Sequence, residues 1–265
     1  MLKLFITLSV LQIINGLPEN LNTMKSHGVR IINGSDAPEG KYPSLVSLQQ
    51  RGYHICGAFI LTKHFVATAA HCVESSSVIL RELQIVSSIT NLYDKARSRK
   101  YQVTEIISHE KYNASDLLVN DIALLMINPS FSLDTGEALA MLPKKMETQP
   151  TGAMASAVGW GRKVHGGIAS YLLQEVEMRI LNYWDCSQII GQIHSTQFCV
   201  ESKNSGICEG DSGGPLYVNE QVVGIASWRD GNKPCGRAMG VYTQLSLYTD
   251  WVNMHVTQRS LQPTN

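Results

Sequence analysis

GDSGGP, residues 210–215, is the stretch from which the fold and chemistry of this 265-residue chain are inferred. Glycine weakens helices and strand interiors, and proline lacks the backbone donor that both need. We therefore expect a tight, exposed turn that presents the hydroxyl of Ser212 together with neighbouring backbone N–H groups. Because a serine is a weak nucleophile until a base takes its proton, the turn predicts a histidine and an orienting carboxylate elsewhere in the chain.

Two other stretches supply candidate partners for Ser212. His71 lies in TAAHC, beside a cysteine whose disulfide would fix the backbone next to the imidazole, and Asp121 opens the apolar run NDIALL. Alone, His71 could be a core histidine, and Asp121 could cap a strand at the surface or be buried against a donor. With Ser212 they match the nucleophile, base and orienting carboxylate of acyl-transfer enzymes.

The backbone beside the serine is a candidate oxyanion hole. The N–H groups of Gly210 and Ser212 could stabilise the negative charge that develops on an attacked carbonyl oxygen. Removing one such donor in other enzymes costs about 3–4 kcal/mol of transition-state stabilisation.

The N-terminus has the pattern of a secretory signal peptide. Lys3 precedes an apolar run over residues 4–14, and the small residue Gly16 follows. The run is shorter than the roughly 20 residues that a membrane span requires, which disfavours an anchor. We expect residues 1–16 to be a signal peptide and the chain to be secreted, with no membrane partner.

Residues 17–30 are polar and have neither periodicity nor cysteine. A basic residue followed by an apolar cluster, Arg30 before Ile31, indicates a processing site; the alternative is a linker leading into a first strand. We expect residues 17–30 to be an activation propeptide and residues 31–265 the folded domain.

The composition describes a globular chain with no strong charge bias. Hydrophobic residues make up 44% and charged residues 17%, with 22 basic and 22 acidic side chains. This balance excludes a disordered chain and gives no support to a nucleic-acid partner.

Six cysteines in a secreted chain favour disulfides. Sequence order suggests that each cysteine pairs with the next, although order alone leaves other connectivities open. No pair has C-x-x-C spacing, which disfavours zinc. The cysteines are Cys56, Cys72, Cys186, Cys199, Cys208 and Cys235.

Most of the chain after residue 31 has the pattern of short strands separated by Gly, Pro, Asn and Asp turn signals. Such spacing indicates a barrel or a sandwich. The expected strands include residues 44–48, 57–61, 65–68, 83–86, 122–127, 155–158 and 222–227. Near the C-terminus, apolar and aromatic side chains recur at helical spacing from Leu247 to Val256, which predicts an amphipathic helix.

With these motifs in place, the chain resembles the chymotrypsin/trypsin-like family of serine proteases. The resemblance is carried, in the family's order, by RIINGSDA, TAAHC, NDIALL, GWG, GDSGGP, SW and GVYT. It implies an all-β fold of two packed six-stranded antiparallel β-barrels with a C-terminal α-helix. The expected extents are about residues 31–140 for the N-terminal barrel, about 141–245 for the C-terminal barrel and about 246–258 for the helix.

The resemblance also implies roles for the site residues. His71 would be the general base, Asp121 its orienting partner and Ser212 the nucleophile, with the N–H groups of Gly210 and Ser212 as the oxyanion hole. Ser227 would border the aspartate and bind the substrate backbone. The family's usual disulfides match the pairing suggested by order.

Activation follows from the same resemblance. Cleavage after Arg30 would free the amino group of Ile31 to pair with Asp211, and a buried ion pair can switch a loop because neither charge is tolerated alone. Without a cysteine, the propeptide should be released.

The expected specificity pocket departs from that of trypsin. Gly206 stands where trypsin carries an aspartate, Ile207 is its neighbour, and Gly240 lies on the opposite wall. A pocket without a carboxylate should accept apolar or aromatic side chains rather than Arg or Lys. The enzyme should then not activate itself at Arg30, so we expect a separate trypsin-like protease to do so.

The pocket entrance is unusual because Arg229 follows Trp228, where the family usually has glycine. Arg229 could turn to solvent, narrow the pocket and favour small residues, or pair with an acidic substrate residue. Gly231 could instead take the place of the usual glycine.

The sequence thus predicts a monomeric serine endopeptidase that acts on proteins or peptides, with no cofactor or metal and with possible protein inhibitors. The alternative is a non-catalytic binding homologue. Asn33 and Asn113 stand in glycosylation sequons. A basic cluster on a loop could be an exosite or a solvated surface: Lys95, Arg97, Arg99 and Lys100.

Overall fold

The computed structural model describes residues 34–162, 166–230, 234–235 and 239–260. The expected signal peptide, the propeptide, Arg30, Ile31 and Asn33 lie outside the described residues, as does Gly231.

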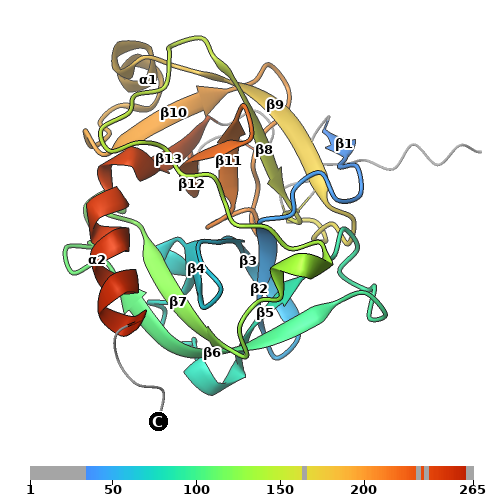
Figure 1. Cartoon of the computed structure of the whole chain (residues 1–265). Coiled ribbons are helices and arrows are strands. Elements are labelled where there is room, and N and C mark those ends of the chain that lie inside the picture. Colours follow the sequence, from blue (N-terminus) through green and yellow to red (C-terminus); the bar gives the residue numbers. More distant parts are fainter. Residues whose placement is uncertain (1–33, 163–165, 231–233, 236–238, 261–265) are drawn as a thin grey trace, which may run out of the picture.

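The first half of the chain closes into a barrel of six antiparallel strands (Figure 1). Around the barrel, the strands are β2 (Leu45–Gln50), β3 (Tyr53–Ile60), β4 (Phe65–Thr68), β7 (Ala123–Asn128), β6 (Arg99–Ser108) and β5 (Leu83–Ser87).

The second half forms a second six-stranded barrel, which is closed by pairing between β8 and β9. Its strands, in order, are β8 (Met154–Gly159), β9 (Gln174–Ile180), β10 (Gln197–Glu201), β13 (Gly240–Gln244), β12 (Gln221–Arg229) and β11 (Pro215–Val218). The short β1 (Ser35–Asp36) pairs with β9, although it precedes the first barrel in sequence. The all-β, two-barrel expectation is confirmed.

Alternating burial along the strands explains why the sheets close. In β9 the residues Gln174, Val176, Met178 and Ile180 are buried while the charged residues between them face outward. A strand exposes successive side chains on opposite faces, so this alternation gives one inner and one outer surface.

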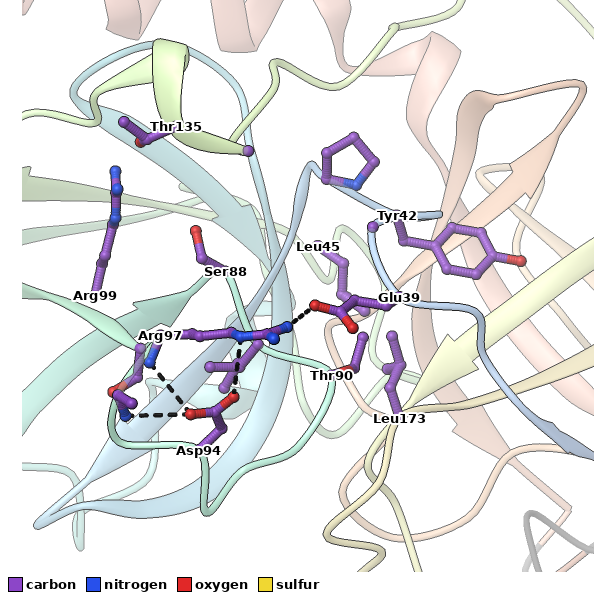
Figure 2. Close-up of a pocket in the computed structure, with 16 residues that line it drawn as sticks. Glu39, Tyr42, Leu45, Ser88, Thr90, Asp94, Arg97, Arg99, Thr135 and Leu173 are labelled. Atoms are coloured by element: carbon purple, nitrogen blue, oxygen red, sulfur yellow. Dashed lines mark hydrogen bonds and ion pairs between the residues drawn. The ribbon is translucent and has the colours of Figure 1, made fainter.

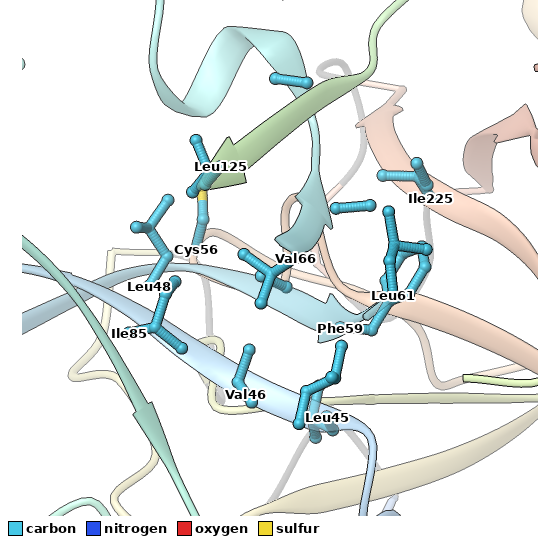
Figure 3. Packing of buried hydrophobic residues seen from close by; sticks show 14 of the residues in the cluster. Leu45, Val46, Leu48, Cys56, Phe59, Leu61, Val66, Ile85, Leu125 and Ile225 are labelled. Carbon is cyan, nitrogen blue, oxygen red and sulfur yellow. The ribbon is translucent and has the colours of Figure 1, made fainter. Parts of the chain in front are cut away.

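The core of the first barrel extends to the second barrel, which also has a buried cluster of its own. Leu45, Val46, Leu48, Phe59 and other apolar side chains fill the first barrel, and Ile225 of β12 packs against the same cluster (Figure 3). A separate buried cluster that includes Val176, Met178, Leu216 and Val223 fills the second barrel. The site lies where the barrels meet.

Helix α2 (Thr249–Ser260) follows the 3₁₀ turn Leu245–Leu247, so the α-helix begins later than expected. Val252 and His255 face the barrel and are buried. Glu110 holds the helix by accepting hydrogen bonds from Trp251 Nε1 and His255 Nε2, each at 2.9 Å.

Helix α1 (Tyr183–Ile190) was missed by the sequence reading, although its ends carry ordinary signals. The side chain of Asn182 accepts a hydrogen bond from the Asp185 N–H at 2.7 Å, and Gly191 ends the helix with a φ of 83°. Among the described residues, no helix combines the length and apolar character needed to cross a bilayer.

Three disulfides join the cysteines in sequence order. They are Cys56–Cys72, Cys186–Cys199 and Cys208–Cys235.

Candidate active site

The ends of two neighbouring strands bring His71 and Asp121 together. Strands β4 and β7 pair with Thr68 opposite Ala123, so the residues just beyond this pair lie side by side. His71 lies in the 3₁₀ turn Ala70–Cys72, which the disulfide to Cys56 ties to β3. His71 Nδ1 lies 2.7 Å from Asp121 Oδ2, and the His71 backbone N–H donates to Asp121 Oδ1 at 2.9 Å.

Asp121 is fully buried, and its environment supplies several donors. Ser227 donates its hydroxyl to Asp121 Oδ2 at 2.6 Å, and Thr243 Oγ1 donates to the backbone carbonyl of Asp121 at 3.0 Å. A carboxylate can remain in the interior when its oxygens accept this many hydrogen bonds. Of the two alternatives for Asp121, the structure selects the buried one.

The GDSGGP turn lies between the barrels and forms backbone hydrogen bonds with both. Gly57 of β3 donates its N–H to the Ser212 carbonyl at 2.8 Å, and Gly213 donates to the Ala226 carbonyl of β12 at 2.8 Å. A Cβ at Gly213 would lie 2.2 Å from Thr68 Oγ1, and the residue has a φ of 74°, so only glycine fits there.

The expectation of an exposed turn is therefore wrong in part. Gly210 and Ser212 are partly exposed, whereas Asp211 and the residues after Ser212 are buried. Close packing against both barrels covers the rest of the turn.

Ser212 and His71 line the same cavity, whose volume is about 460 Å³. No hydrogen bond joins Ser212 Oγ to His71, both of which the structure describes. Catalytic hydrogen bonds are often long in unliganded enzymes and shorten when substrate binds. The Nδ1 of His71 is held by Asp121, so the other ring nitrogen, Nε2, is the one available to a proton from Ser212.

Two backbone donors next to Ser212 are unused. Within the described part of the chain, neither the Gly210 N–H nor the Ser212 N–H donates to a protein acceptor. Gly210 has a φ of 99° and its carbonyl faces His54 Nε2 at 2.8 Å, which fixes the orientation of the peptide group. This arrangement can receive an oxyanion.

His54 is a site residue that sequence reasoning missed, because a lone histidine in a strand carries no distinctive signal. Burial lowers its pKa to about 4, so the imidazole is neutral at pH 7. Its Nε2 faces the carbonyl of Gly210, which requires the proton on Nε2 and leaves Nδ1 to accept from Ser47 Oγ at 2.8 Å.

Comparison with known proteins agrees with this geometry. The family model described as Trypsin matches residues 31–252. This chain belongs to the trypsin family of serine endopeptidases. It is 34% identical to a trypsin of Phaedon cochleariae, over 85% of this chain and 88% of the relative. It is 32% identical to trypsin delta of Drosophila melanogaster, over 95% of this chain and 98% of the relative.

The fold of this trypsin-family protease is also found in a solved structure of human heparin binding protein. The TM-score is 0.77 at 24% identity, covering 88% of this chain and 99% of that one. At this level of identity the likeness concerns the fold.

The buried carboxylate of Asp211 in this protease packs against the GWG motif, residues 159–161. Its carboxylate accepts the N–H of Gly161 at 2.7 Å and of Cys208 at 2.9 Å. A Cβ at Gly159 would lie 2.3 Å from Asp211 Oδ1, which explains that glycine. Burial raises the pKa of Asp211 to about 6, and among the described residues no cationic side chain pairs with it.

The expected pocket residues lie together on the C-terminal barrel. Arg229 is paired with Gly240 across β12 and β13, and a Cβ at Gly240 would lie 3.2 Å from Ile207 Cδ1. Trp228 precedes Arg229 on β12, and Gly206 precedes Ile207.

Arg229 does not turn to solvent. Its side chain is 15% exposed, and Nη2 lies 2.6 Å from Oε1 of Glu209, a residue that the sequence did not single out.

Within the described ranges, two groups of side chains have the spacing of metal ligands, but neither suits a metal. One contains Cys56 and Cys72 and the other Cys208 and Cys235, and both cysteine pairs form disulfides. A disulfide has no thiolate to coordinate a cation.

Two of the four residues in the basic cluster, Arg97 and Arg99, are paired with carboxylates. Arg97 pairs with Glu39 and Asp94 across a cavity of about 460 Å³ (Figure 2), and Arg99 Nη1 lies 3.7 Å from the buried carboxylate of Glu137. Arg99 belongs to β6 rather than to a loop. Both alternatives for this cluster, an exosite or a solvated surface, stay predictions.

Proposed function

We propose that this endopeptidase is secreted, is made as a zymogen cut after Arg30, and hydrolyses peptide bonds through an acyl-enzyme on Ser212. The observation that carries the proposal is the buried Asp121, which holds the Nδ1 edge of His71 while Ser212 and His71 line one cavity.

In the proposed mechanism, Ser212 Oγ attacks the scissile carbonyl carbon while His71 Nε2 takes the hydroxyl proton. Asp121 stabilises the resulting imidazolium through Nδ1–H, and the N–H groups of Gly210 and Ser212 stabilise the oxyanion. His71 then gives its proton to the leaving amine as the C–N bond breaks. Water, deprotonated by His71, then attacks the acyl carbon. The bond from that carbon to Ser212 Oγ breaks, His71 returns the proton to Oγ, and the carboxylic acid product leaves.

The proposed preference is for apolar over basic residues before the scissile bond. Gly206 supplies no carboxylate to pair with Lys or Arg, and Ile207 and Gly240 offer an apolar surface. The relatives named trypsin share the family, while this preference rests on the residues of this chain.

Activation is proposed to run through Asp211. Cleavage after Arg30 would provide the amino group of Ile31 as a cation for the buried carboxylate, whose pKa burial has raised. A preference for apolar residues assigns this cut to a separate trypsin-like protease.

The test starts from the purified pro-form, cut after Arg30 with immobilised trypsin. A phosphonate that reacts with activated serines should label the cleaved protein and leave the Ser212→Ala variant unlabelled. A peptide series should show hydrolysis after apolar residues and little after Arg or Lys. Absence of labelling would favour the non-catalytic homologue, and strong cleavage after Arg or Lys would contradict the proposed preference.

The activating step has a separate test. The pro-form incubated alone should keep its N-terminus intact, and rapid self-cleavage after Arg30 would contradict the need for a second protease.

A further inference from the structure

Two segments of the C-terminal barrel face each other beside Ser212. The first segment is residues 206–209, which directly precede the GDSGGP turn. The second is the end of β12, where Arg229 pairs with Gly240 of β13. Ile207 approaches Gly240, and the N–H of Gly213 binds the carbonyl of Ala226 in β12 at 2.8 Å. A carbonyl held by the Gly210 and Ser212 N–H groups would therefore direct the adjacent side chain between these two segments.

An ion pair between Glu209 and Arg229 joins the two segments. Glu209 Oε1 and Arg229 Nη2 lie 2.6 Å apart, with 38% and 15% of their side chains exposed. Glu209 directly precedes Gly210, and it lines the cavity that contains Ser212 and His71. The pair thus lies next to the proposed oxyanion donors, on the path that a substrate side chain would take.

We propose that the Glu209–Arg229 ion pair crosses the entrance of the specificity pocket and restricts the protease to small apolar side chains, such as alanine and valine. This inference rests on the proposed function and narrows its apolar preference. Ile207 lies close against Gly240 near this pair, so the space there would suit a small side chain, whereas an aromatic ring would also have to separate Glu209 from Arg229. Breaking a close contact between two partly desolvated charges costs free energy.

The charge balance of the pair argues against an acidic substrate side chain. Arg229 is already neutralised by Glu209, so an incoming carboxylate would compete with Glu209 for the guanidinium while being repelled by it. Replacement of Glu209 removes this competition and repulsion, so cleavage after acidic residues should rise relative to the unmodified enzyme.

The experiment uses the cleaved enzyme and peptides that differ only before the scissile bond, with Ala, Val, Phe or Asp at that position. The unmodified enzyme should cleave after Ala or Val about 10- to 100-fold better than after Phe, as judged by kcat/KM. Arg229→Gly should raise the Phe-to-Ala ratio at least about 10-fold, and Glu209→Gln should raise the Asp-to-Ala ratio.

Two controls separate the pair from a general effect of charge or volume. The charge-swapped variant, Glu209→Arg with Arg229→Glu, should restore the preference for Ala over Phe. Arg97→Ala should leave every ratio unchanged, because Arg97 pairs with Glu39 and lines a different cavity from the one that contains Ser212. Because the pair is partly exposed, raising the salt concentration should also shift the unmodified enzyme toward Phe.

The outcomes distinguish this inference from the proposed function. If the phosphonate labels Ser212 but Phe is cleaved as well as Ala, or if Arg229→Gly leaves the ratio unchanged, only the ion-pair inference is wrong. If neither the unmodified enzyme nor Arg229→Gly is labelled, the proposed function fails and the inference fails with it.

Discussion

The two sides of the active site are built in different ways. On the side of the first barrel, His71 and Asp121 follow paired strands and are fixed by a disulfide and several buried hydrogen bonds. On the side of the second barrel, Glu209 and Arg229 come from separate segments and are joined by an ion pair between partly exposed side chains. The difference teaches that the groups proposed for the chemistry are fixed to a fully buried carboxylate, whereas the groups proposed to select a substrate meet at a partly exposed one.

The largest expected effect is on the first side. Asp121→Asn should lower kcat about 10,000-fold, because an amide cannot hold the same His71 tautomer or stabilise its imidazolium. Steady-state kinetics on the best apolar peptide would measure this, with circular dichroism as the control for folding. A loss below about tenfold would show that Asp121 is not the orienting group.

The second effect concerns Asp211, which lies between the two sides. Its pKa of about 6 in the fold exceeds the ordinary value of 3.8, so the folded state binds the proton more tightly than the unfolded state. Stability is therefore lost as the pH rises from about 4 to 6, by up to about 3 kcal/mol in the uncut chain.

Asp211→Asn in the uncut chain should remove that loss. Urea unfolding at pH 4 and pH 7 would measure the change for both proteins. The half-buried His54, whose pKa is lowered to about 4, acts in the opposite direction over a similar range, so only the difference between the variant and the parent isolates Asp211. Parallel pH profiles for the two proteins would refute the prediction.

A smaller effect is expected where the two sides meet at Ser227. Ser227→Ala removes the 2.6 Å hydrogen bond to Asp121 Oδ2 but leaves the contacts from His71. We expect kcat/KM to fall about tenfold, because hydrogen bonds to charged groups contribute about 1.5–3 kcal/mol. Ser44→Ala, at a buried serine bonded to Tyr217 instead, is the matched control and should leave kcat/KM unchanged.

The smallest effect lies outside both sides, on helix α2. Arg259 binds Glu105 through Nε and Nη2 at 2.9 and 2.6 Å, and both side chains are partly exposed. Arg259→Ala should lower the free energy of unfolding by at most about 1 kcal/mol and leave kcat/KM intact. Lys145→Ala, which breaks the more exposed pair with Asp250, should have a smaller effect.

The sequence was most informative where one residue type has few alternatives. His71, Asp121 and Ser212 were proposed because a nucleophile, a base and an orienting carboxylate require those residue types, and the structure brings the three together. The glycines after Ser212 follow from close contacts that leave no room for a Cβ. All the strands named in advance occur, since apolar runs between turn residues indicate strands directly.

The sequence was least informative about side chains that could reach several different partners. Arg229 left three alternatives open, because its long side chain could reach solvent, the pocket or a carboxylate. Glu209 carried no signal, since an acidic residue beside a turn is usually solvated. The burial of the GDSGGP turn was misjudged because the groups that bind it are distant in sequence. They are the N–H of Gly57 and the carbonyl of Ala226.

The GDSGGP turn also links the two barrels through backbone hydrogen bonds. The carbonyl of Ser212 is bonded to Gly57 in one barrel, and the N–H of the next residue is bonded to Ala226 in the other. Neither half of the chain, expressed alone, would then hold the serine in register. We expect the two halves to regain hydrolysis only when they are mixed and reassemble. On heating, hydrolysis should be lost as soon as the two barrels separate at this turn, at a lower temperature than the unfolding of either barrel.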